Sequence, residues 1–216
     1  MNEIFKFKTE EEGAYKTIFT DHLYVKLNKE TGAIIFLDSN KRPILKAAGK
    51  DASTFTRAVV GGESIFHVKQ LFYITEDEGL YGLGQFENPM MNYRGKDILL
   101  AQANRTAVNP FLVSTKGYGI LWDNPSESRF HDGADGMYLW SEVADQIDYY
   151  FVYGPTIDEV IAGYRKITGG APMFGKWASS SCASAFGYPA CASVTEDESV
   201  LVSSTAMIWF FFTLSL

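Results

Sequence analysis

The clearest pattern near the start of the chain is an alternation of apolar and polar residues. Leu23, Val25 and Leu27 alternate with more polar neighbours, which is typical of a half-buried β-strand. Residues 29–32 have the composition of a turn, and residues 33–37 form a second apolar run. The pattern therefore predicts a β-hairpin in this part of the chain.

The same kind of pattern continues through the first two thirds of the sequence. Residues 53–60 and 64–74 are runs of strand-forming residues separated around Gly61 and Gly62, which predicts a second hairpin. Many short strands joined by glycine-containing turns predict an all-β fold, an antiparallel β-sandwich, for residues 1–154. Near the end of this part, apolar side chains again occupy every second position: Ile147, Tyr149, Phe151 and Tyr153.

One helix is predicted after the strands. Thr156 is followed three residues later by Glu159, the spacing of a capping box in which each side chain bonds the other residue's backbone amide. Gly169 and Gly170 supply a C-terminal stop. We therefore expect residues 155–177 to hold a helix and a linker. The apolar residues of the helix form one stripe at helical spacing, which core packing explains: Ile157, Val160, Ile161, Tyr164 and Ile167.

Four glycines interrupt stretches that are otherwise rich in strand-forming residues: Gly82, Gly84, Gly117 and Gly119. Glycine weakens a strand, so its presence usually marks a bulge, a bend or a close approach of two backbones. The sequence therefore predicts a locally distorted region of the sheet between residues 80 and 124.

Composition supports a folded domain and excludes one class of partner. The 216 residues are 46% hydrophobic and 15% aromatic, which is enough for a sizeable core and argues against wholesale disorder. The net charge is −7 and the basic residues are scattered, so we expect no nucleic acid partner.

Neither end of the chain carries a targeting or membrane pattern. The N-terminus lacks the apolar run of a signal peptide, which makes the cytoplasm the default compartment. The apolar run at residues 206–216 has 11 residues, whereas a helix needs about 20 to span a bilayer, so we expect no membrane partner. The sequence leaves the compartment and the oligomeric state open.

Side chains that could bind a metal are scattered along the chain. Cys182 and Cys191 lie far in the sequence from the three histidines, and a structural zinc site needs four ligands. Asp132 and Asp135 lie in a glycine-containing loop, but the spacing of a calcium loop is missing and a plain turn fits better. The adjacent acids at residues 76–78 are interpreted as a solvated turn. We expect no metal and no cofactor.

Several blocks of sequence occur in an order that points to one family. The first block is Tyr81-Gly82-Leu83-Gly84-Gln85, and with the later blocks it resembles glycoside hydrolase family 31, the α-glucosidases and α-xylosidases. The resemblance implies an N-terminal β-sandwich of the galactose-mutarotase-like type. The sequence of residues 173–178 is more similar to the α-xylosidases than to the α-glucosidases. The later blocks are residues 109–114, 116–124, 148–151 with 154–155, 164–169, and 172–178.

The same resemblance implies that the catalytic residues lie elsewhere. Family members are retaining hydrolases in which two Asp residues flank the scissile bond on a (β/α)₈ barrel that begins after Trp177-Ala178. Such a barrel takes about 250 residues, and 38 residues follow Ala178. We therefore expect a non-catalytic N-terminal domain of a retaining α-glycosidase, without catalytic residues and inactive alone. Residues 178–216 contain no Lys or Arg and are interpreted as an aberrant tail, frameshifted or disordered.

One loop is a candidate for contact with sugar. The resemblance implies that a loop of the sandwich reaches toward the barrel's pocket, and the matching stretch is residues 102–107. Asn104 and Arg105 in this loop carry forked donors suited to sugar hydroxyls. The alternative interpretation is a hairpin tip with ordinary surface residues. The aromatic residues either stack on sugar or, more often, fill the core: Trp122, Trp140, Tyr149 and Tyr150.

Three functions therefore remain, of which the third is an interaction protein that uses the face the barrel would have covered. In the first, the domain supports the barrel of an intact enzyme that acts on an α-linked oligosaccharide. In the second, it is a free-standing carbohydrate-binding module that binds sugar without hydrolysis.

Overall fold

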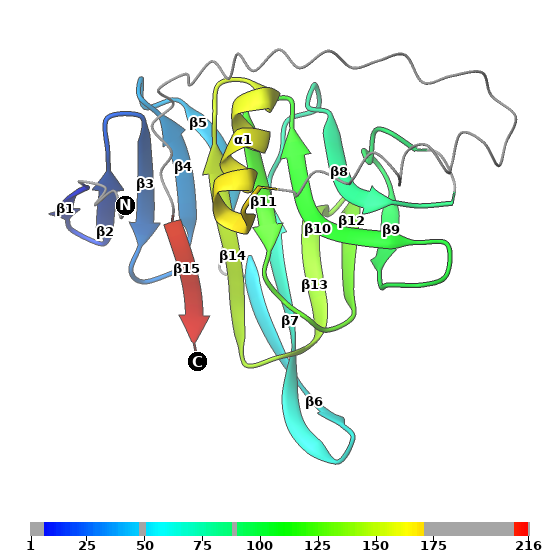
Figure 1. Cartoon of the computed structure of the whole chain (residues 1–216). Coiled ribbons are helices and arrows are strands. Elements are labelled where there is room, and N and C mark those ends of the chain that lie inside the picture. Colours follow the sequence, from blue (N-terminus) through cyan, green and yellow to red (C-terminus); the bar gives the residue numbers. More distant parts are fainter. Residues whose placement is uncertain (1–6, 48–50, 88–89, 171–209, 216) are drawn as a thin grey trace, which may run out of the picture.

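A computed structural model describes residues 7–47, 51–87, 90–170 and 210–215 of the chain (Figure 1). Within these ranges the chain forms three five-stranded antiparallel sheets and one α-helix. The linker at residues 171–177 and most of the predicted tail, including both cysteines, lie outside the described residues.

The first sheet is a meander in which each strand pairs with the next. The predicted first hairpin is confirmed, because Leu23 lies opposite Asp38 and Leu27 lies opposite Ile34. Leu23 and Val25 are fully buried, as their alternation indicated. The strands are β1 (Lys8–Glu12), β2 (Tyr15–Phe19), β3 (Leu23–Asn28), β4 (Ile34–Asp38) and β5 (Pro43–Ala47).

The second sheet has the strand order β6-β7-β13-β12-β9. Its first two strands are the second predicted hairpin, which is confirmed and turns at Gly61 and Gly62, where φ is 62° and 90°. The strands are β6 (Ser53–Val60), β7 (Glu63–Phe72), β9 (Asp97–Leu100), β12 (Ser128–Gly133) and β13 (Gly136–Ala144).

The third sheet has the strand order β15-β14-β11-β10-β8. The alternation in β14 is confirmed, since Ile147, Tyr149 and Phe151 are all buried. The strands are β8 (Leu80–Gln85), β10 (Ala107–Ser114), β11 (Tyr118–Trp122), β14 (Gln146–Tyr153) and β15 (Phe210–Ser215).

The strand β15 differs from what the sequence indicated, because residues 178–216 show no strand periodicity. The six residues of β15 pair antiparallel with β14, from Gln146 opposite Ser215 to Phe151 opposite Phe210. Pairing at a sheet edge is made by backbone groups, so a run of strand-forming residues such as Phe-Phe-Phe-Thr can add a strand without alternation.

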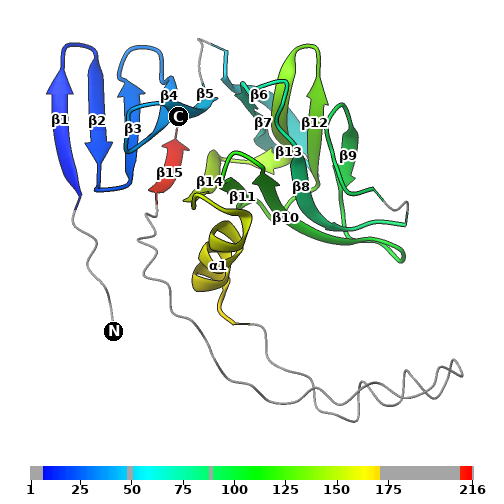
Figure 2. The same ribbon diagram turned by 90° about the horizontal axis from the view of Figure 1, so that it is seen from above.

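The sheets form two layers, which confirms the predicted β-sandwich. The first and second sheets lie side by side and are joined by an antiparallel bridge between Lys46 and Tyr73. Together they face the third sheet, as the view from above shows (Figure 2). The layers meet in one core, in which Phe36 of β4 stacks on Phe151 of β14 with ring centroids 3.9 Å apart.

The helix α1 (Ile157–Thr168) begins at the predicted capping box. The Thr156 hydroxyl accepts a hydrogen bond from the Glu159 amide (3.3 Å), and the Thr156 amide donates to the Glu159 carboxylate (2.9 Å). Gly169 ends the helix with a positive φ of 86°. Both ends of the helix are therefore confirmed as the sequence predicted them.

The helix covers the outer face of the third sheet (Figure 1). Phe111 stacks on Tyr164 with centroids 4.3 Å apart, and Val160 is fully buried. The predicted apolar stripe is only partly buried, since Ile157 and Ile161 are 38% and 43% exposed. The stripe is wider than the contact with the sheet. No helix within the described ranges is long and apolar enough to cross a membrane.

The first two glycines of the predicted distorted region lie in β8. Gly82, Leu83 and Gly84 have consecutive positive φ values of 102°, 60° and 106°. The pairing of β8 with β10 shifts register between Val108 and Leu112 at the same place. The predicted bulge and close backbone approach are therefore confirmed.

Candidate functional site

The loop between β9 and β10 projects from one end of the second and third sheets. Ala103 and Thr106 pair with each other through two backbone hydrogen bonds of 3.2 Å, which makes the loop a tight hairpin. The Gln102 side chain closes its base, because its amide donates to the Val108 carbonyl (2.9 Å) and its oxygen accepts from the Val108 amide (3.0 Å). The hairpin is therefore fixed at its base.

The tip of this hairpin is formed by the two residues that the sequence singled out. Asn104 and Arg105 are both exposed. The Arg105 guanidinium forms an ion pair with the carboxylate of Glu87, and the two side chains are 74% and 59% exposed. An ion pair this exposed is worth about 0–1 kcal/mol, so a ligand can replace it at little cost.

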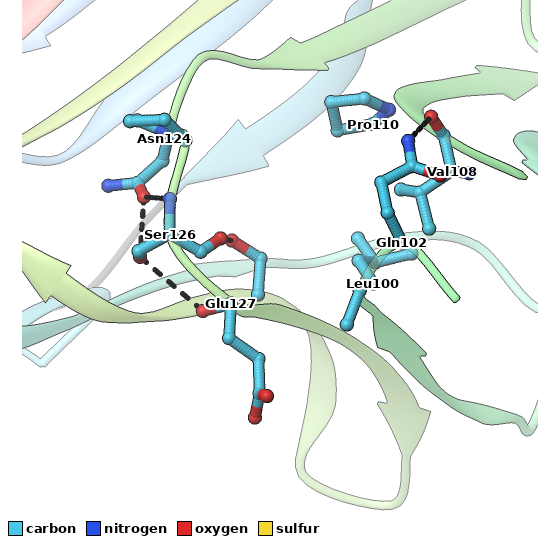
Figure 3. Close-up of a pocket in the computed structure, with 10 residues that line it drawn as sticks. Leu100, Gln102, Val108, Pro110, Asn124, Ser126 and Glu127 are labelled. Carbon is cyan, nitrogen blue, oxygen red and sulfur yellow. Dashed lines mark hydrogen bonds between the residues drawn. The ribbon is translucent and has the colours of Figure 1, made fainter. Parts of the chain in front are cut away.

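A pocket of about 340 Å³ lies beside the base of the hairpin. One wall comes from the hairpin's base and the start of β10, where Gln102 and Val108 lie next to Pro110 (Figure 3). The opposite wall is formed by residues 124–127, between β11 and β12, and by Ser128 at the start of β12. The volume is large enough for one small ligand group, near the lower limit of typical ligand pockets.

The wall opposite the hairpin is held by side-chain hydrogen bonds. The Asn124 oxygen accepts from the Ser126 amide (2.8 Å) and from the Ser126 hydroxyl (2.6 Å), as Figure 3 shows. The Asn124 amide donates to the Val143 carbonyl (3.2 Å), which ties the wall to β13. This wall is therefore formed before any ligand arrives.

Asn104 and Arg105 do not line this pocket; the base of their hairpin does. The sequence located the loop but not the pocket, since its far wall lies some twenty residues away in the chain. Among the candidate aromatic residues, Trp122 and Tyr149 are fully buried core residues. Trp140 and Tyr150 are partly exposed.

The acidic turn before β8 differs from the expected solvated turn at one residue. The expected solvation of residues 76–78 holds for Glu76 and Asp77, which are exposed, but not for Glu78, which is 2% exposed. Lys116 donates to Asp77 (2.6 Å), and this bond, with one from Thr75, lowers the pKa of Asp77 to about 2.

Glu78 is the centre of a buried hydrogen-bond network. One carboxylate oxygen accepts from the Ser114 hydroxyl (2.6 Å) and from the Tyr118 hydroxyl, and the other accepts from the Thr75 amide (3.1 Å). Burial first, and then the negative charge of Glu78, raise the pKa of Tyr118. The network joins the start of β8 to β10 and β11, and so fixes where β8 begins.

Asp132 is also held by hydrogen bonds from protein groups. It is 7% exposed, and Arg94 and the Gly95 amide donate to the same carboxylate oxygen at 2.8 and 2.7 Å. The predicted plain turn is present at residues 134–135, because Gly133 pairs with Gly136. In the described part of the chain, no three His, Cys, Asp or Glu side chains are grouped as metal ligands.

The fold and the loop together define a class: an all-β sandwich domain that carries a projecting hairpin beside an open pocket. Residues 2–131 match the family model described as the glycosyl hydrolase 31 N-terminal galactose mutarotase-like domain. The chain belongs to this family.

Known relatives agree with this assignment. The chain is 38% identical over 168 residues to an α-xylosidase of Saccharolobus solfataricus, a match that covers 74% of this chain and 22% of the relative. It is 35% identical over 101 residues to an uncharacterized family 31 glucosidase of Pseudescherichia vulneris, covering 47% of this chain and 19% of that protein. The chain thus spans about a fifth of the length of these curated relatives.

A solved structure supports the same fold. The crystal structure of a GH31 α-xylosidase from a soil metagenome, complexed with xylose, superposes with a TM-score of 0.74 and 26% sequence identity. The match covers 82% of this chain and 29% of that protein. This sequence therefore corresponds to the N-terminal, non-catalytic part of α-xylosidase-like enzymes.

Proposed function

We propose that this chain serves a retaining α-glycosidase of the α-xylosidase type as its N-terminal domain, and that its β9–β10 hairpin contacts the substrate sugar. The catalytic pair of acids would come from a barrel segment that this sequence does not contain. The observation that carries the proposal is the hairpin itself, whose base is locked by Gln102 while Asn104 and Arg105 remain exposed.

The chemistry of the tip suits an α-linked oligosaccharide. The Arg105 guanidinium presents several N–H donors in a fixed fork, and the Asn104 amide offers donors and an acceptor, which together match adjacent sugar hydroxyls. Glu87 holds Arg105 only through an exposed ion pair, so the guanidinium can turn to a ligand. A binding site also needs opposing walls, and the tip stands on one side only. We therefore assign the remaining walls to the barrel.

The first prediction concerns the chain by itself. Purified chain should show no turnover of aryl α-xylosides or aryl α-glucosides, because no catalytic barrel is present. Titration calorimetry with xyloglucan and maltose oligosaccharides should show no binding at millimolar sugar, because the tip supplies one wall of a site. Turnover would refute the assignment of the catalytic acids, and sugar binding without turnover would favour the free-standing binding module.

The second prediction concerns Arg105 when a barrel is present. We expect Arg105→Ala, in a chimera that joins this domain to the barrel of the Saccharolobus solfataricus relative, to raise KM about tenfold. The loss corresponds to about 1.5 kcal/mol for one hydrogen bond from a charged group. Steady-state kinetics on an aryl α-xyloside measures it.

A matched control is available for this substitution. Arg42 is 74% exposed, as Arg105 is, and forms an ion pair with Asp38 at the far end of the first sheet. Arg42→Ala should leave KM unchanged. Equal effects of the two substitutions, or no effect of Arg105→Ala, would show that the hairpin is an ordinary surface turn.

A further inference from the structure

The strand β6 is an open edge of the second sheet. It pairs with β7 through eight consecutive residues, from Ser53 opposite Gln70 to Val60 opposite Glu63, without a register shift. No described strand pairs with its other side. Figure 1 shows the β6–β7 hairpin reaching beyond the other strands. The unpaired backbone groups of such an edge are a template for another strand.

Four of the other five sheet edges in the described part of the chain, all except β15, carry features that hinder such pairing. The edge strand β9 has only four residues, and β8 is bent by three consecutive residues with positive φ. The edge strand β1 carries three adjacent glutamates, and β5 begins with Pro43. Short length, distortion, charge and proline are the usual means by which proteins protect an edge. β6 has none of them except a single charge, Arg57.

We propose that β6 is a homodimerisation site, at which the β6 strands of two copies of this chain pair antiparallel across a two-fold axis. The occupant is a second copy because the strand is complementary to itself in one register, as the positions of its residues show. The pairing would join two five-stranded sheets into one continuous sheet.

Backbone geometry limits the registers that two β6 strands can adopt. In an antiparallel strand, the N–H and C=O groups of alternate residues point to the same side. The groups that face outward therefore belong to every second residue. Two copies can form backbone hydrogen bonds only if odd-numbered residues of one lie opposite odd-numbered residues of the other, and even-numbered opposite even-numbered. The two-fold axis then lies between the two copies of one β6 residue, which we call the residue at the axis.

Length and charge select the residue at the axis. An axis at Thr56 or at Arg57 pairs seven residues of each copy, whereas an axis at Phe55 or Ala58 pairs five. With Arg57 at the axis, two guanidiniums face each other, which is destabilising. With Thr56 at the axis, two threonines face each other and Arg57 lies across from Phe55 of the second copy, which are both favourable pairs.

Apolar side chains near this edge would also lose contact with water. Val59 at the tip of the hairpin is 72% exposed and Val60 is 37% exposed, and Phe55 is half-buried. The paired surface is nevertheless small, so we expect a reversible equilibrium between monomer and dimer.

The test uses opposite charges at the axis. In sedimentation velocity, the full chain should shift from monomer to dimer as its concentration is raised. Thr56→Lys alone and Thr56→Glu alone should each weaken the dimer, because like charges then face each other. An equimolar mixture of the two variants should associate at least about tenfold more tightly than either variant alone.

The control is Thr54→Lys, on the same face of the same strand. Thr54 would lie across from Ala58 of the second copy, so this change creates no pair of like charges and should weaken the dimer less than Thr56→Lys does. Thr56 is exposed, so its variants should keep the thermal midpoint of the parent. A chain that stays monomeric at all concentrations would overturn the proposal. So would association that the Thr56 variants leave unchanged, which would point to another edge such as β15.

Discussion

Replacing Glu78 with alanine should destabilise the domain by about 3–5 kcal/mol, because it removes the centre of a buried network. The hydroxyls of Ser114 and Tyr118 would lose the carboxylate that accepts their hydrogen bonds, and both residues are fully buried. An orphaned buried donor costs about 1–3 kcal/mol. Urea unfolding followed by tryptophan fluorescence measures the loss.

A neighbour in the same turn provides the control. Glu76 is exposed, so Glu76→Ala should change the free energy of unfolding by less than about 0.5 kcal/mol. If the two substitutions cost the same, the Glu78 network contributes nothing specific and the interpretation is wrong.

A double substitution separates the network from simple loss of packing. Adding Tyr118→Phe to Glu78→Ala removes a donor that the first change had orphaned. The combined loss should therefore be about 1–2 kcal/mol smaller than the sum of the two single losses. Additive losses would mean that the two groups do not interact.

The correct predictions from sequence are those that depend on local signals. The β3–β4 hairpin follows from alternation over a few residues around a turn, and the start of α1 follows from Thr156 and Glu159 within one turn. Gly82 and Gly84 predicted a distorted strand, because few other residues tolerate positive φ. In each case the residues that decide the structure are close together in the chain.

The features that the sequence did not reveal depend on distant residues. Glu78 meets Ser114 and Tyr118 across 36 and 40 residues, and nothing in its own turn distinguishes it from the exposed acids beside it. The pocket also depends on distant residues, because the hairpin base and residues 124–128 meet only after β9 has paired with β12 and the third sheet, which contains β10, has packed against the second. Exposure of Ile157 and Ile161 likewise depends on how far α1 extends over the third sheet.

The second large effect is expected at Gly84 of β8, which lies opposite Val108 near the start of β10. A Cβ added to Gly84 would lie 2.1 Å from the Ala107 carbonyl oxygen and 2.7 Å from the Asn109 amide nitrogen. Both are backbone atoms and cannot rotate away. Gly84→Ala must therefore move β10, and we expect a loss of about 3–5 kcal/mol from this clash and from the positive φ of 106°.

A substitution at a second glycine distinguishes the contribution of the clash from that of the backbone strain. Gly95 also has a positive φ, 68°, but an added Cβ would meet no atom within 4 Å. Gly95→Ala should cost only about 1–2 kcal/mol, the cost of a left-handed conformation for alanine. Equal losses in urea unfolding would show that φ alone decides the effect, and that the close approach of the two strands does not matter.

The same clash links the glycine to the proposed sugar-binding hairpin. Ala107 is the first residue of β10 and follows the hairpin directly, and Val108 holds the Gln102 side chain that closes its base. Displacing β10 at this point should disturb that closure, so amide chemical shifts of residues 102–108 should change in Gly84→Ala. Gly82→Ala places its Cβ 2.3 Å from the Phe111 carbonyl oxygen, farther along β10. It should destabilise the domain comparably while changing the hairpin shifts less.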